Sequence, residues 1–148
     1  MAAPLVPTEF TVPTHFKGHG FRLEPLGPEH NDRDHAAWMS SIDHIHSTPG
    51  FEESEWPRPM SLEANLADLE RHARDFTDRA GFTYSVLDGD EVIGCLYIYP
   101  ARTESGDASA RSWVTESKTT MDVIVWRDVS AWLADEWPFH NPVYAHRE

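Results

Sequence analysis

The sequence is poor in features that would define whole classes of protein. It has a single cysteine, Cys95, so no disulfide can form within the chain. It has no apolar run of the length that crosses a bilayer. Residues 1–14 have neither the basic region nor the apolar region of a signal peptide. These absences predict a cytoplasmic protein without a membrane span.

Basic residues are also scarce. The chain has 12 Lys and Arg against 25 Asp and Glu, which gives a formal net charge of -13 at pH 7. A surface of that charge repels phosphate backbones and anionic membranes, so we expect neither nucleic-acid binding nor membrane binding. The electrostatic field of this net charge also opposes the binding of an anionic cofactor, unless hydrogen-bond donors or basic residues close to the site overcome it.

Large apolar side chains, by contrast, are abundant. Six Trp, seven Phe and four Tyr accompany a hydrophobic fraction of 40%. In a chain of 148 residues this supply is sufficient for one domain with its own core. Residues 1–19 mix prolines and polar residues without periodicity, so we expect an irregular arm followed by one domain over residues 20–148.

The hydrophobic pattern of residues 20–148 changes between the strand period and the helix period. Alternation and short apolar runs predict strands, and spacings of three and four predict helices. The pattern predicts strand 21–26, helix 31–47, helix 61–79, strands 82–87 and 91–99, strand 110–115, helix 120–137 and a short edge strand 142–145. This order indicates an α/β fold with a mixed, mainly antiparallel central sheet flanked by helices.

Two of these elements carry specific expectations about the core. Strand 91–99 is apolar on both faces, so we expect it to be central, with Cys95 buried and inert. Helix 61–79 has one apolar stripe that should pack on the sheet. The stripe consists of Leu62, Leu66, Leu69, Ala73 and Phe76.

The segment from Gly81 to Pro100 carries a resemblance to a known family. Its two strands read Gly81-Phe-Thr-Tyr-Ser-Val-Leu-Asp88 and Glu91-Val-Ile-Gly-Cys-Leu-Tyr-Ile-Tyr-Pro100, and Asp-Gly between them favours a tight hairpin. They resemble the central hairpin of the GNAT N-acetyltransferases, in which a hydrophobic-hydrophobic-Gly sequence recurs. The order of elements resembles the N-terminal two-thirds of that fold, the acyl-CoA N-acyltransferase fold, truncated at the C-terminus.

The resemblance implies an N-acetyltransferase that uses acetyl-coenzyme A and a small-molecule amine. It places the pantetheine arm along strand 110–115 and the pyrophosphate at the loop that follows, where free amides and a helix N-terminus make an anion site. The cofactor-binding residues implied are Trp113, Val114, Thr115, Ser117, Lys118, Thr119 and Thr120.

The pyrophosphate loop departs from the family pattern, because residues 116–122 contain no glycine. Residues other than glycine keep a phosphate further from the backbone, and Asp122 puts a negative charge in the first helical turn. We therefore expect weak binding of the cofactor. The alternative interpretation of this loop is an ordinary turn between strand and helix.

Three residues are candidates for acid–base catalysis. Glu116 ends the strand that would flank the cleft and could deprotonate an amine directly or through water. Tyr99 shares a strand face with Tyr97, which could line an aromatic pocket or simply pack in the core. His46 forms a His-x-His pair with His44; it lacks a third spaced ligand, so we expect no metal site.

A second hypothesis is a non-catalytic domain of the same fold that binds a small ligand or a protein partner. The loop without glycine supports it. An open sheet edge would then need to be covered, which predicts a homodimer.

Overall fold

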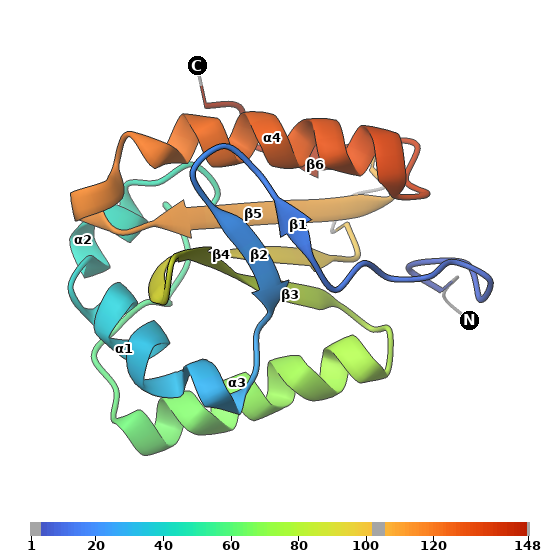
Figure 1. The fold of residues 1–148 in the computed structure, drawn as a ribbon. Helices are drawn as coiled ribbons and strands as arrows, with labels where there is room; N and C mark the ends of the chain where they lie inside the picture. Colours follow the sequence, from blue (N-terminus) through green and yellow to red (C-terminus); the bar gives the residue numbers. More distant parts are fainter. Residues whose placement is uncertain (1–3, 102–105, 148) are drawn as a thin grey trace.

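The computed structural model describes residues 4–101 and 106–147 (Figure 1). Within these residues six strands form one sheet, arranged in the order in which they occur in the chain. All neighbouring strands are antiparallel except β5 and β6, which are parallel. The strands are β1 (Phe16–Lys17), β2 (Arg22–Pro25), β3 (Phe82–Asp88), β4 (Glu91–Tyr99), β5 (Ala108–Val114) and β6 (Pro142–Tyr144). The predicted mixed, mainly antiparallel sheet is confirmed.

Helices cover both faces of this sheet. Helix α4 lies along one face, and α1 and α3 lie on the other, with the short α2 near the end of β5 (Figure 1). The helices are α1 (Asn31–Met39), α2 (Ile42–His46), α3 (Leu62–Thr77) and α4 (Met121–Glu136), and single 3-10 turns occupy Pro28–His30 and Glu116–Lys118.

The sheet divides the core into two clusters. On the α4 side, Ile93 and Leu96 of β4 pack with Val125 of α4. On the α1 and α3 side, Val92 and Cys95 belong to a cluster that contains Trp38 and Leu69. The prediction that this strand is buried on both faces is confirmed, and Cys95 is 1% exposed.

The glycine of the hairpin is required by a close approach between strands. Gly94 lies opposite Val86 on β3 and opposite Val114 on β5. A Cβ atom at this position would overlap the carbonyl oxygen of Trp113. The hydrophobic-hydrophobic-Gly sequence therefore lets β5 lie close against β4.

The predicted helix 31–47 is broken into α1 and α2. Ser40 donates its hydroxyl hydrogen bond to the carbonyl of Ala37 at 2.7 Å, and Ser41 accepts one from the amide of Glu116 at 2.9 Å. Serine side chains that bond to backbone groups compete with the helical ladder. The break therefore gives α2 its own direction and joins it to the end of β5.

Helix α3 begins as predicted but presents a different face. Ser61 accepts a hydrogen bond from the amide of Ala64 at 3.1 Å, as an N-cap does. Leu69 is buried at 2% exposure, whereas Leu62 is 45% exposed. The polar side chain of Asn65 is buried instead, because it bonds to α1. The prediction that Leu62 packs on the sheet is wrong.

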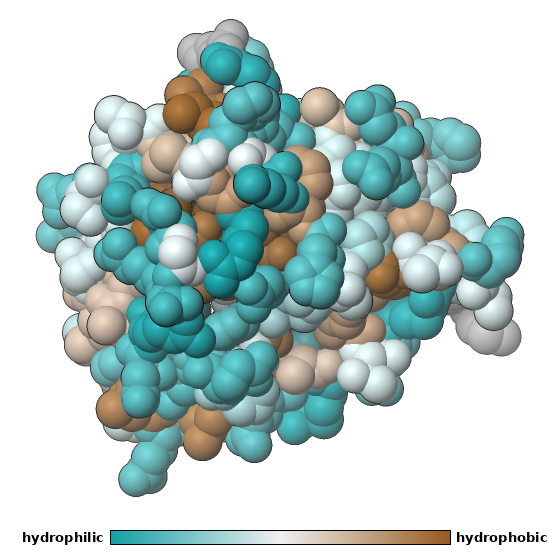
Figure 2. All heavy atoms as spheres, in the orientation of Figure 1, coloured by the Kyte–Doolittle hydropathy of each residue, from teal (hydrophilic) through white to brown (hydrophobic). Residues whose placement is uncertain are grey.

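Part of the segment expected to be an irregular arm belongs to the sheet and its core. Strand β1 lies within residues 1–19, and Val6 packs into the α4-side cluster at 2% exposure. The face shown in Figure 2 is covered mostly by hydrophilic residues, and its hydrophobic residues lie in small scattered groups. No helix in the described part of the chain is long and apolar enough to cross a membrane.

Candidate functional site

A cavity of about 460 Å³ lies between the sheet and the helices α1 and α3. Its aromatic lining is Phe51, Trp56, Tyr97 and Tyr99, and its polar lining includes Asp34, Asn65, Asp68, Arg71, His72, Ser109 and Arg111. A second hollow, of about 550 Å³, lies beside β1 and β2. The titratable side chains around that hollow are not buried, whereas the first cavity has buried polar groups with shifted pKa values. The first cavity is therefore the candidate site.

One end of this cavity holds a chain of hydrogen bonds through Tyr99. The Tyr99 hydroxyl donates to Oδ2 of Asp75 at 2.8 Å. Nδ1 of His72 lies 3.0 Å from the same hydroxyl and 3.1 Å from Oγ1 of Thr83. Nδ1 of His72 can donate to the tyrosine oxygen or accept the hydroxyl proton of Thr83, and these two choices correspond to the two neutral tautomers. With Nδ1 as the donor, Nε2 of His72 keeps a lone pair.

Burial keeps this histidine uncharged at neutral pH. Desolvation lowers the pKa of His72 to about 4, and the nearby positive charge of Arg71 lowers it further, while Asp75 opposes the change. Burial also raises the pKa of Tyr99 to about 12. A neutral imidazole with a free lone pair can accept a proton from a group bound in the cavity.

Another part of the lining carries a buried carboxyl group. Asp34 on α1 is 4% exposed, and its Oδ2 accepts a hydrogen bond from Nδ2 of Asn65 at 3.0 Å. Asn65 also donates to Oδ1 of Asn31 and accepts from Nε1 of Trp38. Burial raises the pKa of Asp34 to about 6, and the bond from Asn65 opposes that rise. The carboxyl is therefore held in place and is mainly ionised at pH 7.

The aromatic lining is continuous with the core beneath it. The indole of Trp113 donates to the hydroxyl of Tyr97 at 3.0 Å, and Trp113 itself is fully buried. The guanidinium carbon of Arg111 lies 4.8 Å from the ring centroid of Phe51 and 5.8 Å from that of Tyr97. Tyr97 and Tyr99 thus line the cavity, whereas Trp113 packs under it.

The strand predicted to hold the cofactor has an edge where pairing stops. Strand β6 pairs with β5 only as far as Ala110, opposite Tyr144. The amide of Thr115 donates to the carbonyl of Ile93 at 2.8 Å. Because backbone direction alternates along a strand, Trp113 and Thr115 face β4, and Ser112 and Val114 direct their backbone groups to the edge. Of the three predicted strand residues, only Val114 faces the edge.

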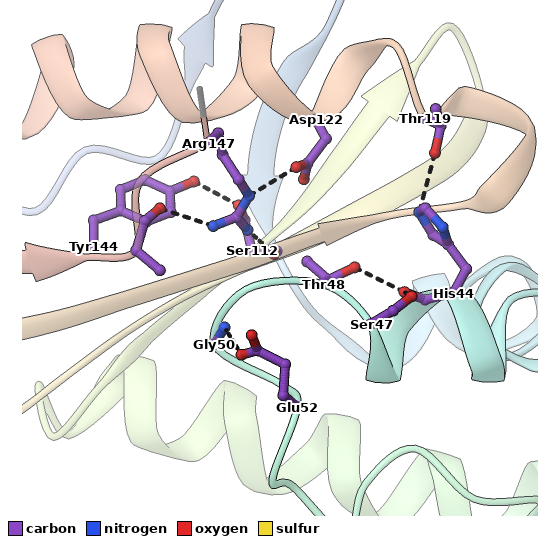
Figure 3. A network of polar contacts seen from close by, with 11 residues as sticks. His44, Ser47, Thr48, Gly50, Glu52, Ser112, Thr119, Asp122, Tyr144 and Arg147 are labelled. Carbon is purple, nitrogen blue, oxygen red and sulfur yellow. Dashed lines mark hydrogen bonds and ion pairs between the residues drawn. The ribbon is translucent and has the colours of Figure 1, made fainter.

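Arg147 lies against this edge, between β5 and the start of α4 (Figure 3). Its Nη2 donates to the carbonyl of Ser112 at 2.8 Å, and its Nε donates to Oδ2 of Asp122 at 2.7 Å. Its Nη1 donates to the carbonyl of Ala145 at 2.8 Å. The Arg147 side chain is 2% exposed. A cofactor that used the Ser112 carbonyl would have to displace this guanidinium.

The predicted phosphate-binding side chains gather at the loop between β5 and α4, and three of them contact other groups of the protein. Nζ of Lys118 lies 3.4 Å from Oδ2 of Asp88. Oγ1 of Thr119 lies 3.3 Å from Nε2 of His44 (Figure 3), and Oγ of Ser117 lies 3.2 Å from Oγ1 of Thr115. Thr120 is the N-cap residue of α4 and makes no capping bond through its side chain.

The three predicted catalytic residues do not meet in one place. Tyr99 pairs with Ser109 of β5, whereas Glu116 lies beyond the end of that strand, seven residues further along the chain. Glu116 is exposed at the start of a 3-10 turn. Nε2 of His46 bonds to the carbonyl of Pro57 at 2.7 Å, and His46 is not part of the cavity lining. Only Tyr99 lines the cavity.

Three residues of the cavity lining were not predicted from the sequence, because helical spacing puts them among the polar residues of amphipathic helices. They are Asp34, Asn65 and His72. One signal was available for Asn65, which lies three residues after Leu62 and four before Leu69 and so falls on the apolar stripe. A polar residue there marks a buried hydrogen bond. In the described ranges, no three His, Cys, Asp or Glu side chains are grouped so that they could hold a metal ion.

Comparison with known proteins shows similarity in structure only. No protein-family model matches the sequence, and no curated protein matches it. The structure is similar to that of the ribosomal-protein-S5-alanine acetyltransferase from Vibrio fischeri, with a TM-score of 0.62, 12% identity and 81% of this chain covered. This chain spans 65% of the length of that protein.

Two similar structures are complexes with coenzyme A or with a CoA-disulfide. RimL, a ribosomal L7/L12 alpha-N-protein acetyltransferase in complex with coenzyme A, matches with a TM-score of 0.63 and 14% identity, over 81% of this chain and 66% of its own. RimJ of Mycobacterium smegmatis, in complex with a CoA-disulfide, matches with a TM-score of 0.67 and 12% identity, over 86% of this chain and 62% of its own. Together with the sheet order and the central hairpin, these likenesses show that this chain has the fold of the GNAT acetyltransferases.

Proposed function

We propose that the protein is an N-acetyltransferase that transfers the acetyl group of acetyl-coenzyme A to an amine bound in the cavity. The observation that carries the proposal is the cavity itself, in which a neutral, partly buried histidine of α3, His72, bonds to Tyr99 of β4. Strand β5 is the strand to which the resemblance assigns the cofactor. The coenzyme A complexes of proteins with the same fold support the proposal.

The fit of acetyl-coenzyme A to the β5 edge has one favourable and one opposing feature. The parallel strands β5 and β6 stop pairing after Ala110, which leaves the backbone groups of Ser112 and Val114 directed toward the space between them. The Arg147 guanidinium bonds to the Ser112 carbonyl there. We infer that the pantetheine arm takes the place of Arg147 and that the displaced guanidinium is available to the phosphates.

The chemistry requires a proton acceptor and no covalent enzyme intermediate. The amine nitrogen attacks the thioester carbonyl carbon, the new carbon–nitrogen bond forms, the carbon–sulfur bond breaks, and coenzyme A leaves with the electron pair on sulfur. Nε2 of His72 accepts the proton of the amine, in the tautomer in which Nδ1 donates to the Tyr99 oxygen. The proposal assigns no step to Glu116 or His46.

Release of the coenzyme A thiol tests this proposal. The protein is incubated with acetyl-coenzyme A and a panel of primary amines, and free thiol is measured over time. We expect amine-dependent release that falls by roughly 10²-fold or more in His72→Gln, since general acid–base catalysis contributes about 10²–10⁴-fold. His140→Gln is the control, because His140 is exposed and does not line the cavity. Absence of amine-dependent release from the wild type overturns the proposal.

A non-catalytic role remains the second candidate function, because a specific observation favours it. The Arg147–Asp122 pair covers the β5 edge, and the loop before α4 has no glycine. In this case the protein would bind a ligand in the cavity without using acetyl-coenzyme A. Calorimetric titration with acetyl-coenzyme A separates the two, since only the enzyme binds it. A homodimer that covers the sheet edge, and a cytoplasmic location, also remain predictions.

A further inference from the structure

Asp34 is a buried carboxylate without a cationic partner. It lines the cavity at 4% exposure, and none of the ion pairs among residues 4–101 and 106–147 includes it. Its one hydrogen-bond donor is the neutral amide of Asn65, at 3.0 Å. Burial of an ionised carboxylate is costly unless an opposite charge lies close to it. The cavity therefore contains a site that a positive charge would complete.

The charged groups around Asp34 leave that site unfilled. His35 follows it on α1 and acts to lower the pKa of Asp34, but its Nε2 bonds to the carbonyl of Met60 at 2.7 Å and it makes no ion pair with Asp34 among the described residues. Asp68 on α3 has the same sign as Asp34 and pairs with Arg71 at 3.6 Å. Arg111, which also lines the cavity, lies with its guanidinium carbon 4.8 Å from the ring centroid of Phe51.

The remainder of the lining suits an organic cation better than a hydrated metal ion. Trp56 lies with its ring centroid 6.3 Å from that of Phe51 and 6.4 Å from that of Tyr97. Aromatic faces attract cations, and this cavity already holds one in that way, since the Arg111 guanidinium lies over Phe51 and Tyr97. A volume of about 460 Å³ has room for a small organic molecule.

The charge of the whole protein acts in the same direction. A formal net charge of -13 raises the concentration of cations near the surface and opposes the entry of anions. The field that works against a phosphate-bearing cofactor at the β5 edge therefore favours a positively charged ligand in the cavity.

We propose that the cavity binds a small organic cation whose ammonium group pairs with Asp34 and whose apolar body packs among Phe51, Trp56 and Tyr97. The inference rests on the proposed function only in identifying this ligand as the acceptor substrate, whose ammonium gives one proton to solvent water before the neutral nitrogen attacks and gives the second to His72. The binding itself involves no acetyl-coenzyme A. An uncharged amide or alcohol of the same shape lacks the interaction with Asp34.

Calorimetric titration with matched probes tests this inference in the absence of acetyl-coenzyme A. Benzylammonium supplies the charge and the ring, and benzyl alcohol supplies the ring alone. We expect the wild type to bind benzylammonium roughly tenfold to a hundredfold more tightly than benzyl alcohol, the range that corresponds to one charged hydrogen bond. We expect Asp34→Asn to remove that preference while binding of benzyl alcohol stays unchanged.

Asp32→Asn is the matched control, because it removes the same charge from an exposed position of the same helix. It should leave the preference for benzylammonium intact. The inference is overturned if the wild type binds both probes equally, if it binds neither at millimolar concentration, or if Asp34→Asn keeps the preference while its thermal unfolding is that of a folded protein. The thiol-release assay reports on the proposed function separately, so either result can fail alone.

Discussion

The pair between Arg147 and Asp122 offers a direct test of how the β5 edge is covered. The substitution Arg147→Ala removes a guanidinium that bonds to the carboxylate of Asp122 and to the carbonyl of Ser112. Asp122 is 23% exposed, and its other oxygen, Oδ1, is already buried without a hydrogen-bond partner among the described residues. The substitution therefore leaves a largely buried negative charge unpaired.

The magnitude follows from the burial of the two partners. Removal of one partner from a fully buried ion pair costs about 3–5 kcal/mol. Because water reaches part of Asp122, we expect Arg147→Ala to lower the free energy of unfolding by about 2–3 kcal/mol. Asp122→Asn removes the charge that needs a partner, so the double variant should lose less than the sum of the two single variants.

Urea unfolding of the wild type, the two single variants and the double variant measures this coupling. Arg74→Ala, at an exposed position on α3, is the control and should change stability by less than about 0.5 kcal/mol. If Arg147→Ala unfolds at the wild-type urea concentration, or if the two single effects add, Arg147 does not cover the edge and the reasoning fails.

The same variants test cofactor binding at this edge. We expect Asp122→Asn to tighten coenzyme A binding severalfold, because a negative charge in the first turn of a helix repels phosphate by about 0.3–1 kcal/mol. Lys118→Ala should weaken binding, and both effects should shrink at high salt. Calorimetry at two salt concentrations measures them. Equal affinities in all the proteins would place the cofactor elsewhere.

Three further predictions concern the core and the cavity. Leu69→Ala should lower the free energy of unfolding by about 2–5 kcal/mol and Leu62→Ala by less than about 0.5 kcal/mol, and equal melting temperatures for the two variants would contradict the observed face of α3. Native Cys95 should react slowly with thiol reagents, since burial raises its pKa well above the usual value, and fast labelling of folded protein would disprove this. The Asp34 carboxyl should make the protein less stable as the pH rises. Folding raises its pKa from 3.8 to about 6, so the native state holds the proton more tightly than the unfolded state. The free energy of unfolding should therefore fall by about 3 kcal/mol as the pH rises through this range. Asp34→Asn should therefore gain stability relative to the wild type from pH 4 to pH 7, as measured by urea unfolding, and parallel pH profiles would refute the assignment.

The local pattern of the sequence was sufficient for most of the elements of the fold. The apolar stretches 82–87 and 91–99, the Asp-Gly turn between them and the glycine at position 94 predict the hairpin. These features act between neighbouring residues, so they can be recognised without knowledge of the rest of the chain. The run of apolar residues on both faces of β4 also predicts its central place in the sheet.

The site was decided by contacts between distant segments. His72, Tyr99 and Asp75 come from a helix and a strand, and Asp34 meets Asn65 across 31 positions of sequence. Spacing along one helix shows which residues share a face, but it does not show what the polar side of that face meets. The polar residues of α1 and α3 therefore resemble solvent-exposed positions until the two helices pack on the sheet.

The difference between what local pattern predicts and what tertiary contacts decide is also seen for Glu116, His46 and Arg147. The sequence places His46 near the end of a helix, and α2 ends at His46; it places Glu116 at the end of a strand, whereas β5 ends at Val114 and Glu116 begins a 3-10 turn. Only the antiparallel register of β4 and β5 places Tyr99 opposite Ser109 and so away from Glu116, and only the return of the chain along β6 brings Arg147 to Ser112. Period and turn chemistry are local and determined the elements, whereas the register and the packing that create the cavity depend on the whole chain.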